Sequence, residues 1–197
     1  MSYQADQSFS LFFVRHGVTD VNFRGLRCGG DLDIPLTDIG CDQAYLLAKQ
    51  IKMMDLDLGL IVCSSLIRVQ QTALIINGVL GNLQTVIDPS FNERLLGDWN
   101  MKSITETEQD LASGVPPPGG ESDEQFQARI ETGVERISAL LPRRPLVVSS
   151  KGVGRILNTI LGGSGRLAVG NGEIVEFAVR RDPLDKLFLD VRRPHQV

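Results

Sequence analysis

Residues 8–17 read SFSLFFVRHG, a mostly apolar run that ends in an arginine, a histidine and a glycine. A short, continuously apolar run that stops at a polar turn is typical of a strand buried on both faces of a parallel sheet. We therefore expect a strand over residues 8–14 that opens the sheet. Arg15 and His16 then stand just past its carboxyl end.

The chain beyond this strand alternates short apolar runs with stretches of helical periodicity. Further strands are expected at residues 58–63, 85–91, 145–149, 174–179 and 187–191. Helices are expected from an N-cap at Thr37 to about Met54, from Ser64 or Ser65 towards Gly78, from a capping box at Ser122 to about Leu141, and over 154–161. This alternation predicts an α/β fold, a three-layer sandwich with a mostly parallel central sheet. Its binding site is expected at the carboxyl ends of the strands.

Composition limits the class of protein. The chain has 197 residues, of which 42% are hydrophobic, and 20 Lys+Arg against 24 Asp+Glu give a net charge of −4. These values fit a single globular domain over residues 1–197, with a polar N-terminal tail over about 1–8, and they exclude global disorder. No basic stripe runs along any segment, so we expect no nucleic-acid partner.

The sequence carries no targeting or disulfide signal. No apolar stretch approaches the roughly 20 residues of a membrane span, and the N-terminus lacks the layout of a signal peptide. We therefore expect a cytoplasmic protein with no membrane partner. Cys28, Cys41 and Cys63 lack CxxC spacing and are interpreted as free thiols rather than as a disulfide framework or a metal site. The sequence leaves a monomer and a homodimer open.

A histidine beside an arginine at the carboxyl end of a strand is a candidate nucleophile. His16 follows Arg15 directly, and Gly17 and Asn22 come shortly after it. Imidazole can attack phosphorus and hold the phosphoryl group covalently, provided that donors neutralise the phosphate oxygens and an acid protonates the leaving alcohol. An isolated Arg-His-Gly tripeptide is more often a pair of surface side chains, so other motifs must support this interpretation.

Such motifs follow along the chain. They are LDIPLT at 32–37, SSL with Arg68 and QTA at 64–73, ERLLGDW at 93–99, and PGGES at 118–122. In the order and spacing of these motifs, from about Phe12 to Arg155, the chain resembles the histidine phosphatase superfamily, the phosphoglycerate mutase-like proteins. The resemblance implies a metal-independent α/β sandwich that has no cofactor and acts on a small phosphorylated substrate or ligand.

The resemblance also implies a role for individual residues. His16 would be the phosphorylated nucleophile, Arg15 and Arg68 would clamp the phosphate, and Glu93 would donate a proton to the leaving oxygen. Guanidinium groups suit this task because they bind phosphate oxygens in pairs. Further phosphate or substrate contacts are expected from the N–H of Gly17, from Asn22 and from the backbone at Gly30.

Each of these residues also has a plainer interpretation. Arg68 can be a solvated helical arginine, and Glu93 can be an exposed loop carboxylate paired with Arg94. The segment 92–120 has weak periodicity and a Pro-Pro-Pro-Gly-Gly run. A connection of this length in a domain of this size is more often functional than incidental, which favours a role in the site.

One family motif is broken. Relatives place a second catalytic histidine in a Ser-His-Gly-Gly-like turn after a later strand, whereas this chain reads SSKGVGR over 149–155. The family spacing puts Ser150 at the position of that histidine, and a slip of one residue would put Lys151 there instead. The only other histidine, His195, is expected to lie in a solvated C-terminal end. Loss of one preorganised donor costs on the order of 3 kcal/mol, about a hundred- to thousand-fold in rate.

The leading hypothesis is a phosphomonoesterase-type hydrolase that works through phosphorylated His16 and is attenuated by Ser150. A phosphoglycerate mutase is less favoured, because mutases place several basic residues after the acid to hold a substrate carboxylate. Between Trp99 and Gly120 this chain has only Lys102.

The alternative is a catalytically inactive relative that binds a phosphorylated ligand or partner as a regulator. It would keep the cradle of Arg15, Arg68 and Asn22. Glu93 favours catalysis over this alternative, because a carboxylate beside a bound phosphate repels it unless the carboxylate is protonated.

Overall fold

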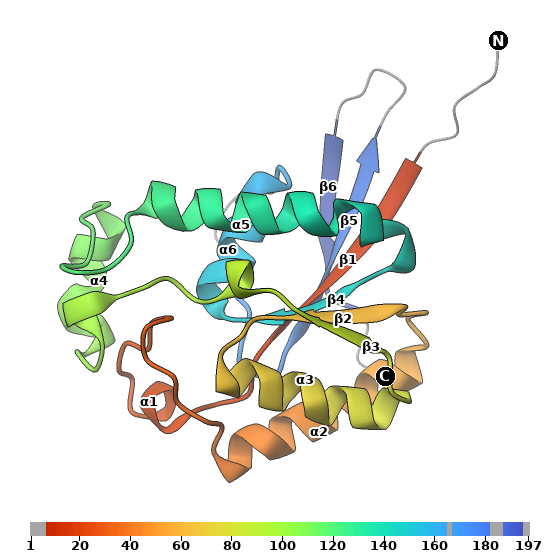
Figure 1. Ribbon diagram of the computed structural model, residues 1–197, viewed down its shortest axis with the longest axis horizontal. Coiled ribbons are helices and arrows are strands. Elements are labelled where there is room, and N and C mark those ends of the chain that lie inside the picture. Colours follow the sequence, from red (N-terminus) through yellow and green to blue (C-terminus); the bar gives the residue numbers. More distant parts are fainter. Residues whose placement is uncertain (1–6, 165–166, 182–186, 195–197) are drawn as a thin grey trace.

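The computed structural model describes residues 7–164, 167–181 and 187–194, and its described strands form one six-stranded sheet (Figure 1). Strands β1 to β4 run parallel to one another, while β5 is antiparallel to β1 and β6 is antiparallel to β5. The α/β fold with a mostly parallel sheet is thereby confirmed. The sheet order is β3-β2-β4-β1-β5-β6, with β1 (Gln7–Arg15), β2 (Leu60–Cys63), β3 (Gln84–Ile87), β4 (Leu146–Ser149), β5 (Ile174–Arg181) and β6 (Leu187–Arg192).

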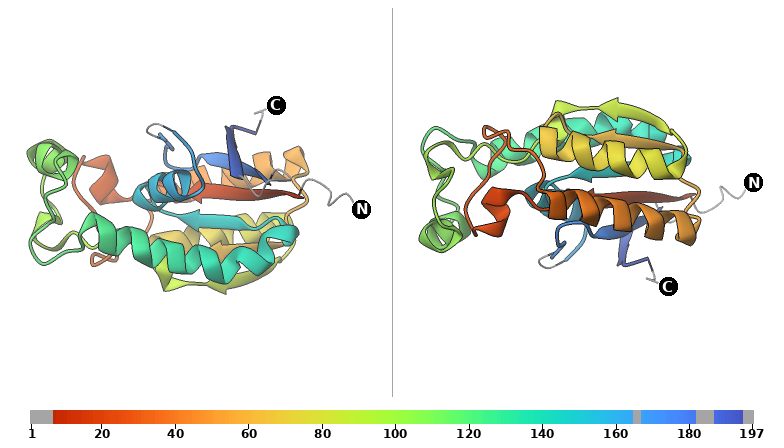
Figure 2. Two further views of the ribbon diagram at one scale, coloured as in Figure 1. Left: turned by 90° about the horizontal axis from the view of Figure 1, so that it is seen from above. Right: turned by 90° about the horizontal axis from the view of Figure 1, so that it is seen from below.

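Helices cover both faces of this sheet (Figure 2). Helices α2 and α3 pack on one face, and α5 and α6 pack on the other. Two further helices, α1 and α4, lie together at one end of the molecule in every view. The helix bounds are α1 (Asp20–Phe23), α2 (Asp38–Met54), α3 (Ile67–Leu80), α4 (Ile104–Ala112), α5 (Asp123–Ile137) and α6 (Lys151–Ile160).

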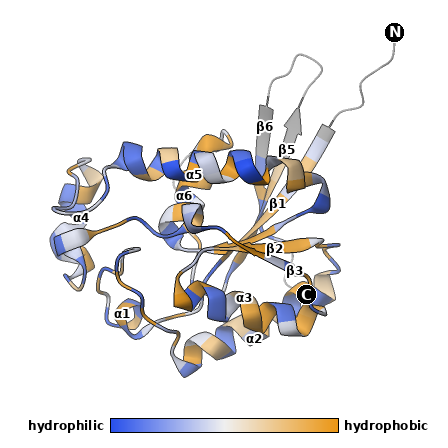
Figure 3. Cartoon of the chain, in the orientation of Figure 1, coloured by the Kyte–Doolittle hydropathy of each residue, from blue (hydrophilic) through white to orange (hydrophobic). Residues whose placement is uncertain are grey.

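The buried strands alternate their side chains between the two layers. Phe12 and Val14 of β1 pack towards α2 and α3, whereas Leu11 and Phe13 pack towards α5 and α6. Because both faces are covered, the central strands are apolar without interruption, as the hydropathy colouring in Figure 3 shows. This core fixes where β1, β2 and β4 end, and therefore where the residues that follow them lie.

Several element ends differ from the predicted ones. Helix α3 begins after Leu66 rather than at a serine cap, because the N–H and the hydroxyl of Ser65 both donate to Asn92 Oδ1. Helix α6 begins at Lys151, earlier than the predicted 154. The strand predicted over 85–91 stops at Ile87 and is followed by a 3-10 turn, η1 (Pro89–Phe91), while the helix predicted to reach about Leu141 changes at Ile137 into η3 (Ser138–Arg143).

The long connection contains structure that the sequence analysis did not predict. It includes the 3-10 turn η2 (Gly97–Trp99) and helix α4, which starts with a capping box of Ser103 and Glu106. A short isolated bridge between Leu26 and Ser103 ties this connection to the segment after α1. The connection thereby folds back onto the segment that follows α1.

Three predictions concern residues at or beyond the described ranges. Strand β1 already starts at Gln7, so the predicted tail over about 1–8 overlaps the strand, and residues 1–6 lie outside the described residues. The sequence also predicts a turn at Asp182-Pro183, between the last two strands. This turn and the C-terminal His195 lie outside the described residues as well. Among the helices of the described residues, none combines the length and the apolar character that crossing a bilayer requires.

Candidate active site

The carboxyl ends of β1 and β4 bring His16 and Ser150 together. Arg15 and Ser149 are partners in the parallel register, and the His16 N–H donates to the Ser149 carbonyl at 2.9 Å. The next residue on each strand is therefore His16 on one and Ser150 on the other. Of the two positions considered for the missing histidine, Ser150 is the one that stands beside His16.

The imidazole of His16 is buried and held in one tautomer. Its side chain is 3% exposed, and Nδ1 lies 2.7 Å from the carbonyl oxygen of Gly17. A carbonyl only accepts, so Nδ1 carries the proton and Nε2 keeps its lone pair. Burial, together with the positive charges of Arg68 and Arg15, lowers the pKa of His16 to about 3, although the hydrogen bond to Gly17 acts in the opposite direction. At neutral pH the ring is therefore a neutral base, and Nε2 is the nitrogen that carries the lone pair.

The guanidinium of Arg68 lies in the first turn of α3 and is 1% exposed, so it is not the solvated arginine of the plainer interpretation. It donates from Nη1 to Leu32 O at 2.9 Å and from Nη2 to Gly29 O at 3.1 Å. Its buried Nε has no hydrogen-bond partner in the part of the chain that the structure describes. Because a guanidinium has five N–H groups, donors remain for an anion beside His16.

Arg15 and Asn22 supply two further polar groups. Arg15 donates from Nη1 to Val169 O at 3.1 Å, and its buried Nε is without a partner among the described residues. Asn22 lies on α1, whose N-cap is Thr19, and the buried Oδ1 of Asn22 likewise finds no partner within the described ranges. Buried polar groups without partners are rare, and at a candidate site they indicate a place for a ligand.

The two predicted glycines make contacts within the protein that support the site. The Gly17 N–H, expected to donate to phosphate, donates instead to Thr72 Oγ1 at 3.2 Å. A phosphate contact of the Gly17 N–H stays a prediction, while the Gly17 carbonyl orients His16. Gly30 donates to Arg94 O at 2.8 Å, and a Cβ on Gly30 would overlap the Glu93 carbonyl. Gly30 thus makes room for the segment that carries Glu93.

Glu93 lies between η1 and η2 and joins that segment to α6. Its Oε1 accepts from the Arg94 N–H at 2.8 Å, and its Oε2 accepts from the Gly152 N–H at 3.0 Å. The Arg94 guanidinium instead forms an ion pair with Asp123 at 2.5 Å. The plainer interpretation of Glu93 as the ion-pair partner of Arg94 is therefore wrong.

Ser150 and Lys151 occupy different surroundings. Ser150 is 1% exposed and is the N-cap residue of α6, but its hydroxyl makes no capping hydrogen bond and has no partner as far as the structure describes the chain. Lys151 is exposed at the start of α6. The buried hydroxyl of Ser150 is thus the polar group that this chain places next to His16.

A cavity of about 360 Å³ opens beside these groups. Arg15, Asn22 and Glu93 belong to its wall, so it adjoins the candidate phosphate position. Helix α4 and nearby loops contribute apolar side chains together with the charged Glu108 and Arg27, whereas α6 contributes cationic side chains. The apolar side chains include Leu26, Leu96, Ile104 and Leu111, and the side chains from α6 include Lys151 and Arg155.

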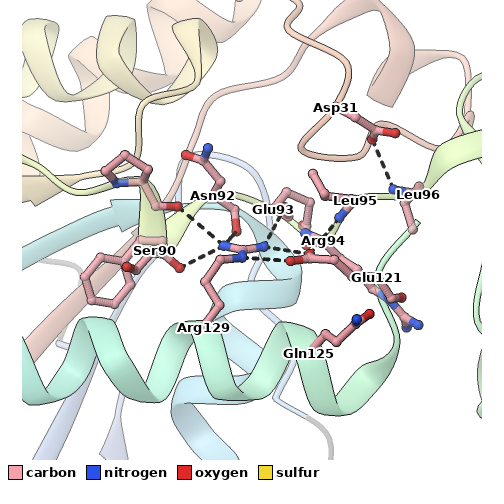
Figure 4. Close-up of polar contacts among 12 residues, drawn as sticks. Asp31, Ser90, Asn92, Glu93, Arg94, Leu95, Leu96, Glu121, Gln125 and Arg129 are labelled. Atoms are coloured by element: carbon pink, nitrogen blue, oxygen red, sulfur yellow. Dashed lines mark hydrogen bonds and ion pairs between the residues drawn. The ribbon is translucent and has the colours of Figure 1, made fainter. Parts of the chain in front are cut away.

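Sequence reasoning missed Arg129 and Glu121, which hold the Glu93 segment in place (Figure 4). Arg129 lies on α5, and Glu121 stands just before that helix. Glu121 is part of the PGGES motif, which was the only signal that the sequence offered for it. Arg129 had no signal, because the backbone carbonyls that it contacts are 36 to 40 residues away along the chain.

An α/β sandwich with a neutral histidine, two arginines and a glutamate at the carboxyl ends of its parallel strands has the architecture of the phosphoglycerate mutase-like proteins. Residues 11–182 match the family described as the histidine phosphatase superfamily (branch 1). The chain belongs to this superfamily.

Relatives include proteins named as phosphatases and as mutases. Adenosylcobalamin/alpha-ribazole phosphatase of Escherichia coli K12 is 33% identical over 156 residues, 73% of this chain and 74% of that protein. The Yersinia pestis protein named "Probable phosphoglycerate mutase GpmB" is 32% identical over 169 residues, 77% of this chain and 74% of that protein. The structure of mycobacterial glucosyl-3-phosphoglycerate phosphatase with VO3 aligns with a TM-score of 0.77 at 28% identity, covering 94% of this chain and 98% of that one. These similarities support phosphatase activity.

Proposed function

We propose that this protein is a phosphomonoesterase that hydrolyses a small phosphorylated metabolite through a phosphohistidine at His16. The observation that carries the proposal is the His16 ring, neutral and protonated at Nδ1, with Arg15 and Arg68 beside it. The relatives named above include phosphatases of alpha-ribazole and glucosyl-3-phosphoglycerate derivatives, which are small phosphorylated molecules. The two guanidinium groups supply the positive charge that phosphoryl transfer requires, so the proposed reaction is metal-independent.

In the first step the lone pair of His16 Nε2 attacks phosphorus. The bond from phosphorus to the ester oxygen breaks, and the leaving oxygen takes the proton of Glu93, so that the alcohol departs. The product is a phosphoimidazolium that keeps its Nδ1 proton, which the Gly17 carbonyl continues to accept. Arg15 and Arg68 hold the phosphoryl oxygens throughout.

In the second step water attacks the phosphoryl group of His16. The carboxylate of Glu93 takes a proton from this water, the bond from phosphorus to Nε2 breaks, and inorganic phosphate leaves. His16 returns to its neutral form and Glu93 to its protonated form, so the cycle is balanced. One carboxyl group acts as acid and then as base, a use of general acid–base catalysis that requires no further group.

Ser150 attenuates this reaction. Its hydroxyl can donate one hydrogen bond to a phosphoryl oxygen, but it carries no charge, unlike an imidazolium. The absent charge lowers the rate by about a hundred- to thousand-fold compared with a site that has both histidines.

The missing positive charge at Ser150 also favours one alternative function. A site that keeps its anion cradle but loses one charged group can bind a phosphate ester without turning it over. The protein would then be a regulator that binds a phosphorylated ligand or partner. Measurement of turnover separates the two functions.

The test is hydrolysis of p-nitrophenyl phosphate and of a panel of small phosphometabolites, with and without EDTA. Three proteins are compared: the natural chain, His16→Ala and Ser150→His. We expect slow turnover of the natural chain that EDTA does not remove and that His16→Ala abolishes. Turnover no greater than that of His16→Ala overturns the enzyme hypothesis. Binding of the same esters by calorimetry would then support the alternative, and a gain of turnover in Ser150→His would mark a decayed enzyme.

A further inference from the structure

The segment that carries Glu93 has little regular secondary structure. It runs from η1 to η2, residues 89–97, so side chains must satisfy many of its backbone groups. Arg129 of α5 donates hydrogen bonds to carbonyl groups of this segment. Its Nη1 lies 2.9 Å from Ser90 O and 3.0 Å from Asn92 O, and its Nη2 lies 3.3 Å from Glu93 O.

Glu121 binds Arg129 and also accepts a hydrogen bond from a backbone N–H group of the same segment. Arg129 donates from Nε to Glu121 Oε1 at 2.8 Å and from Nη2 to Oε2 at 2.7 Å, a paired contact between a guanidinium and a carboxylate. Glu121 Oε2 also accepts from the Leu95 N–H at 2.9 Å. The carboxylate therefore links α5 to the chain two residues after Glu93.

A third side chain anchors the far end of the segment. Asp31 accepts from the N–H groups of Leu96 at 3.0 Å and Gly97 at 2.8 Å. Figure 4 shows these contacts on both sides of Glu93, with Arg129 below the segment and Asp31 beyond it. The backbone on either side of Glu93 is thus fixed by ionic side chains from outside the segment.

We propose that Arg129, paired with Glu121, is the positioning residue that sets the place of the Glu93 carboxyl group. The inference rests on the proposed function, in which Glu93 protonates the leaving oxygen. Arg129 itself reaches the backbone and not the carboxylate of Glu93, and it is absent from the wall of the cavity. It therefore acts through Glu93.

The geometry requires an arginine at this position. Arg129 uses Nε, Nη1 and Nη2 at once, towards two carboxylate oxygens and several carbonyls that lie in different directions. A lysine keeps the charge but offers a single nitrogen, so it cannot bond at once to the Glu121 carboxylate and to the backbone carbonyls of the segment. Arg129→Lys is therefore an informative variant that keeps the charge.

The same helix offers a matched control. Arg136 lies seven residues further along α5 and also bonds to the start of the segment, through the Asp88 carboxylate and the Ser90 hydroxyl. Its hydrogen bonds reach the Asp88 carboxylate, the Ser90 hydroxyl and the Thr132 carbonyl, and none of these is a backbone group near Glu93. Arg136→Lys changes an equivalent side chain without removing support from Glu93.

The readout is the dependence of turnover on the leaving group. An alkyl phosphate needs a proton at its leaving oxygen, whereas p-nitrophenolate leaves without one. The ratio of kcat/KM for the alkyl ester to kcat/KM for p-nitrophenyl phosphate covers only the steps up to release of the alcohol, so it reports on the acid and not on the later hydrolysis of phosphorylated His16. General acid catalysis contributes about 10²- to 10⁴-fold, and we expect Glu93→Gln to lower this ratio about a hundredfold. Arg129→Lys should lower it at least about tenfold, and Arg136→Lys by no more than about twofold. Vanadate affinity should change by no more than about twofold in either arginine variant, because neither residue belongs to the phosphate cradle.

The outcomes separate the inference from the proposed function. If the ratio is unchanged in Glu93→Gln, Glu93 is not the acid and the proposed function is overturned at that point. A ratio lowered in Glu93→Gln but unchanged in folded Arg129→Lys overturns the positioning role. If Arg129→Lys does not fold, Glu121→Gln, which keeps the shape of the side chain, is measured in its place. If neither variant folds, the pair supports the fold as a whole, and the positioning role is overturned as well.

Discussion

The carboxylate of Glu93 accepts a hydrogen bond from the Gly152 N–H at 3.0 Å. This contact joins the segment between η1 and η2 to the first turn of α6, two residues after Ser150. It depends on the missing side chain of Gly152, because a Cβ there would meet Glu93 Oε1 at well under 3.0 Å, where real Cβ contacts essentially never occur. Glu93 and the helix that follows Ser150 are therefore fitted to each other.

Gly152→Ala is expected to displace the Glu93 carboxyl group and to lower the turnover of alkyl phosphates about tenfold or more, since the loss of a positioned acid costs at least this much. Gly78→Ala is the control, because a Cβ at Gly78 meets nothing within 4 Å. That variant should raise the free energy of unfolding by about 0.5–1 kcal/mol and leave turnover unchanged. Equal turnover in Gly152→Ala and the natural chain would contradict the fit between these residues.

His16 is expected to stay neutral far below the ordinary histidine range. Its pKa is about 3 in the folded protein, against 6.5 in its ordinary state. The unfolded chain therefore binds a proton at His16 that the folded chain does not bind, and the stability contributed by His16 is complete above pH 6.5 and is lost as the pH falls towards 3. Near pH 5 this contribution to the free energy of unfolding rises by about 1.4 kcal/mol per pH unit.

Denaturant unfolding of the natural chain and of His16→Asn, measured between pH 4 and 7, checks this slope. The difference between the two proteins isolates His16 from the carboxyl groups that titrate in the same range. NMR titration of the imidazole gives the pKa directly, with His195→Gln to assign the resonances. A midpoint near 6.5 for His16 would contradict the buried neutral ring.

Much of the fold could be predicted because it follows from local pattern. The apolar runs of β1, β2 and β4 are buried on both faces, so their sequences carry no alternation and are easily recognised. Helix α4 could not be predicted in this way, because its sequence ITETEQDLA is mostly polar. Its one local signal was the capping box of Ser103 and Glu106.

The site was predictable only where a motif carried it. The positions of His16 and Ser150 at neighbouring strand ends follow from a parallel sheet once the strands are known. The engagement of the Gly17 N–H with Thr72 depends on where α3 packs, and no spacing in the sequence reports that distance. Arg129 depends in the same way on the path of a loop with little regular secondary structure.

Ser150→Ala is expected to leave stability nearly unchanged. The buried hydroxyl makes no hydrogen bond to the described residues, so its removal leaves none of their polar groups without a hydrogen-bond partner. If the hydroxyl binds a phosphoryl oxygen, the variant should bind vanadate more weakly, by about fivefold for one lost hydrogen bond of roughly 1 kcal/mol. Thermal unfolding with and without vanadate measures both effects, and an unchanged vanadate affinity would remove Ser150 from the anion site.

The apolar side chains of the cavity wall are expected to select the leaving group. Leu111 of α4 lines this wall, and substrate contact with its side chain should be lost in Leu111→Ser. We expect kcat/KM for an aryl phosphate to fall about tenfold, a loss of roughly 1.4 kcal/mol, while that for a small polar phosphate ester changes little. Leu74→Ser is the control, because Leu74 is 74% exposed on α3 and is not part of the cavity wall. A uniform loss for both substrates would show instead that Leu111 supports α4, since a leaving-group contact must discriminate between an aromatic and a polar alcohol.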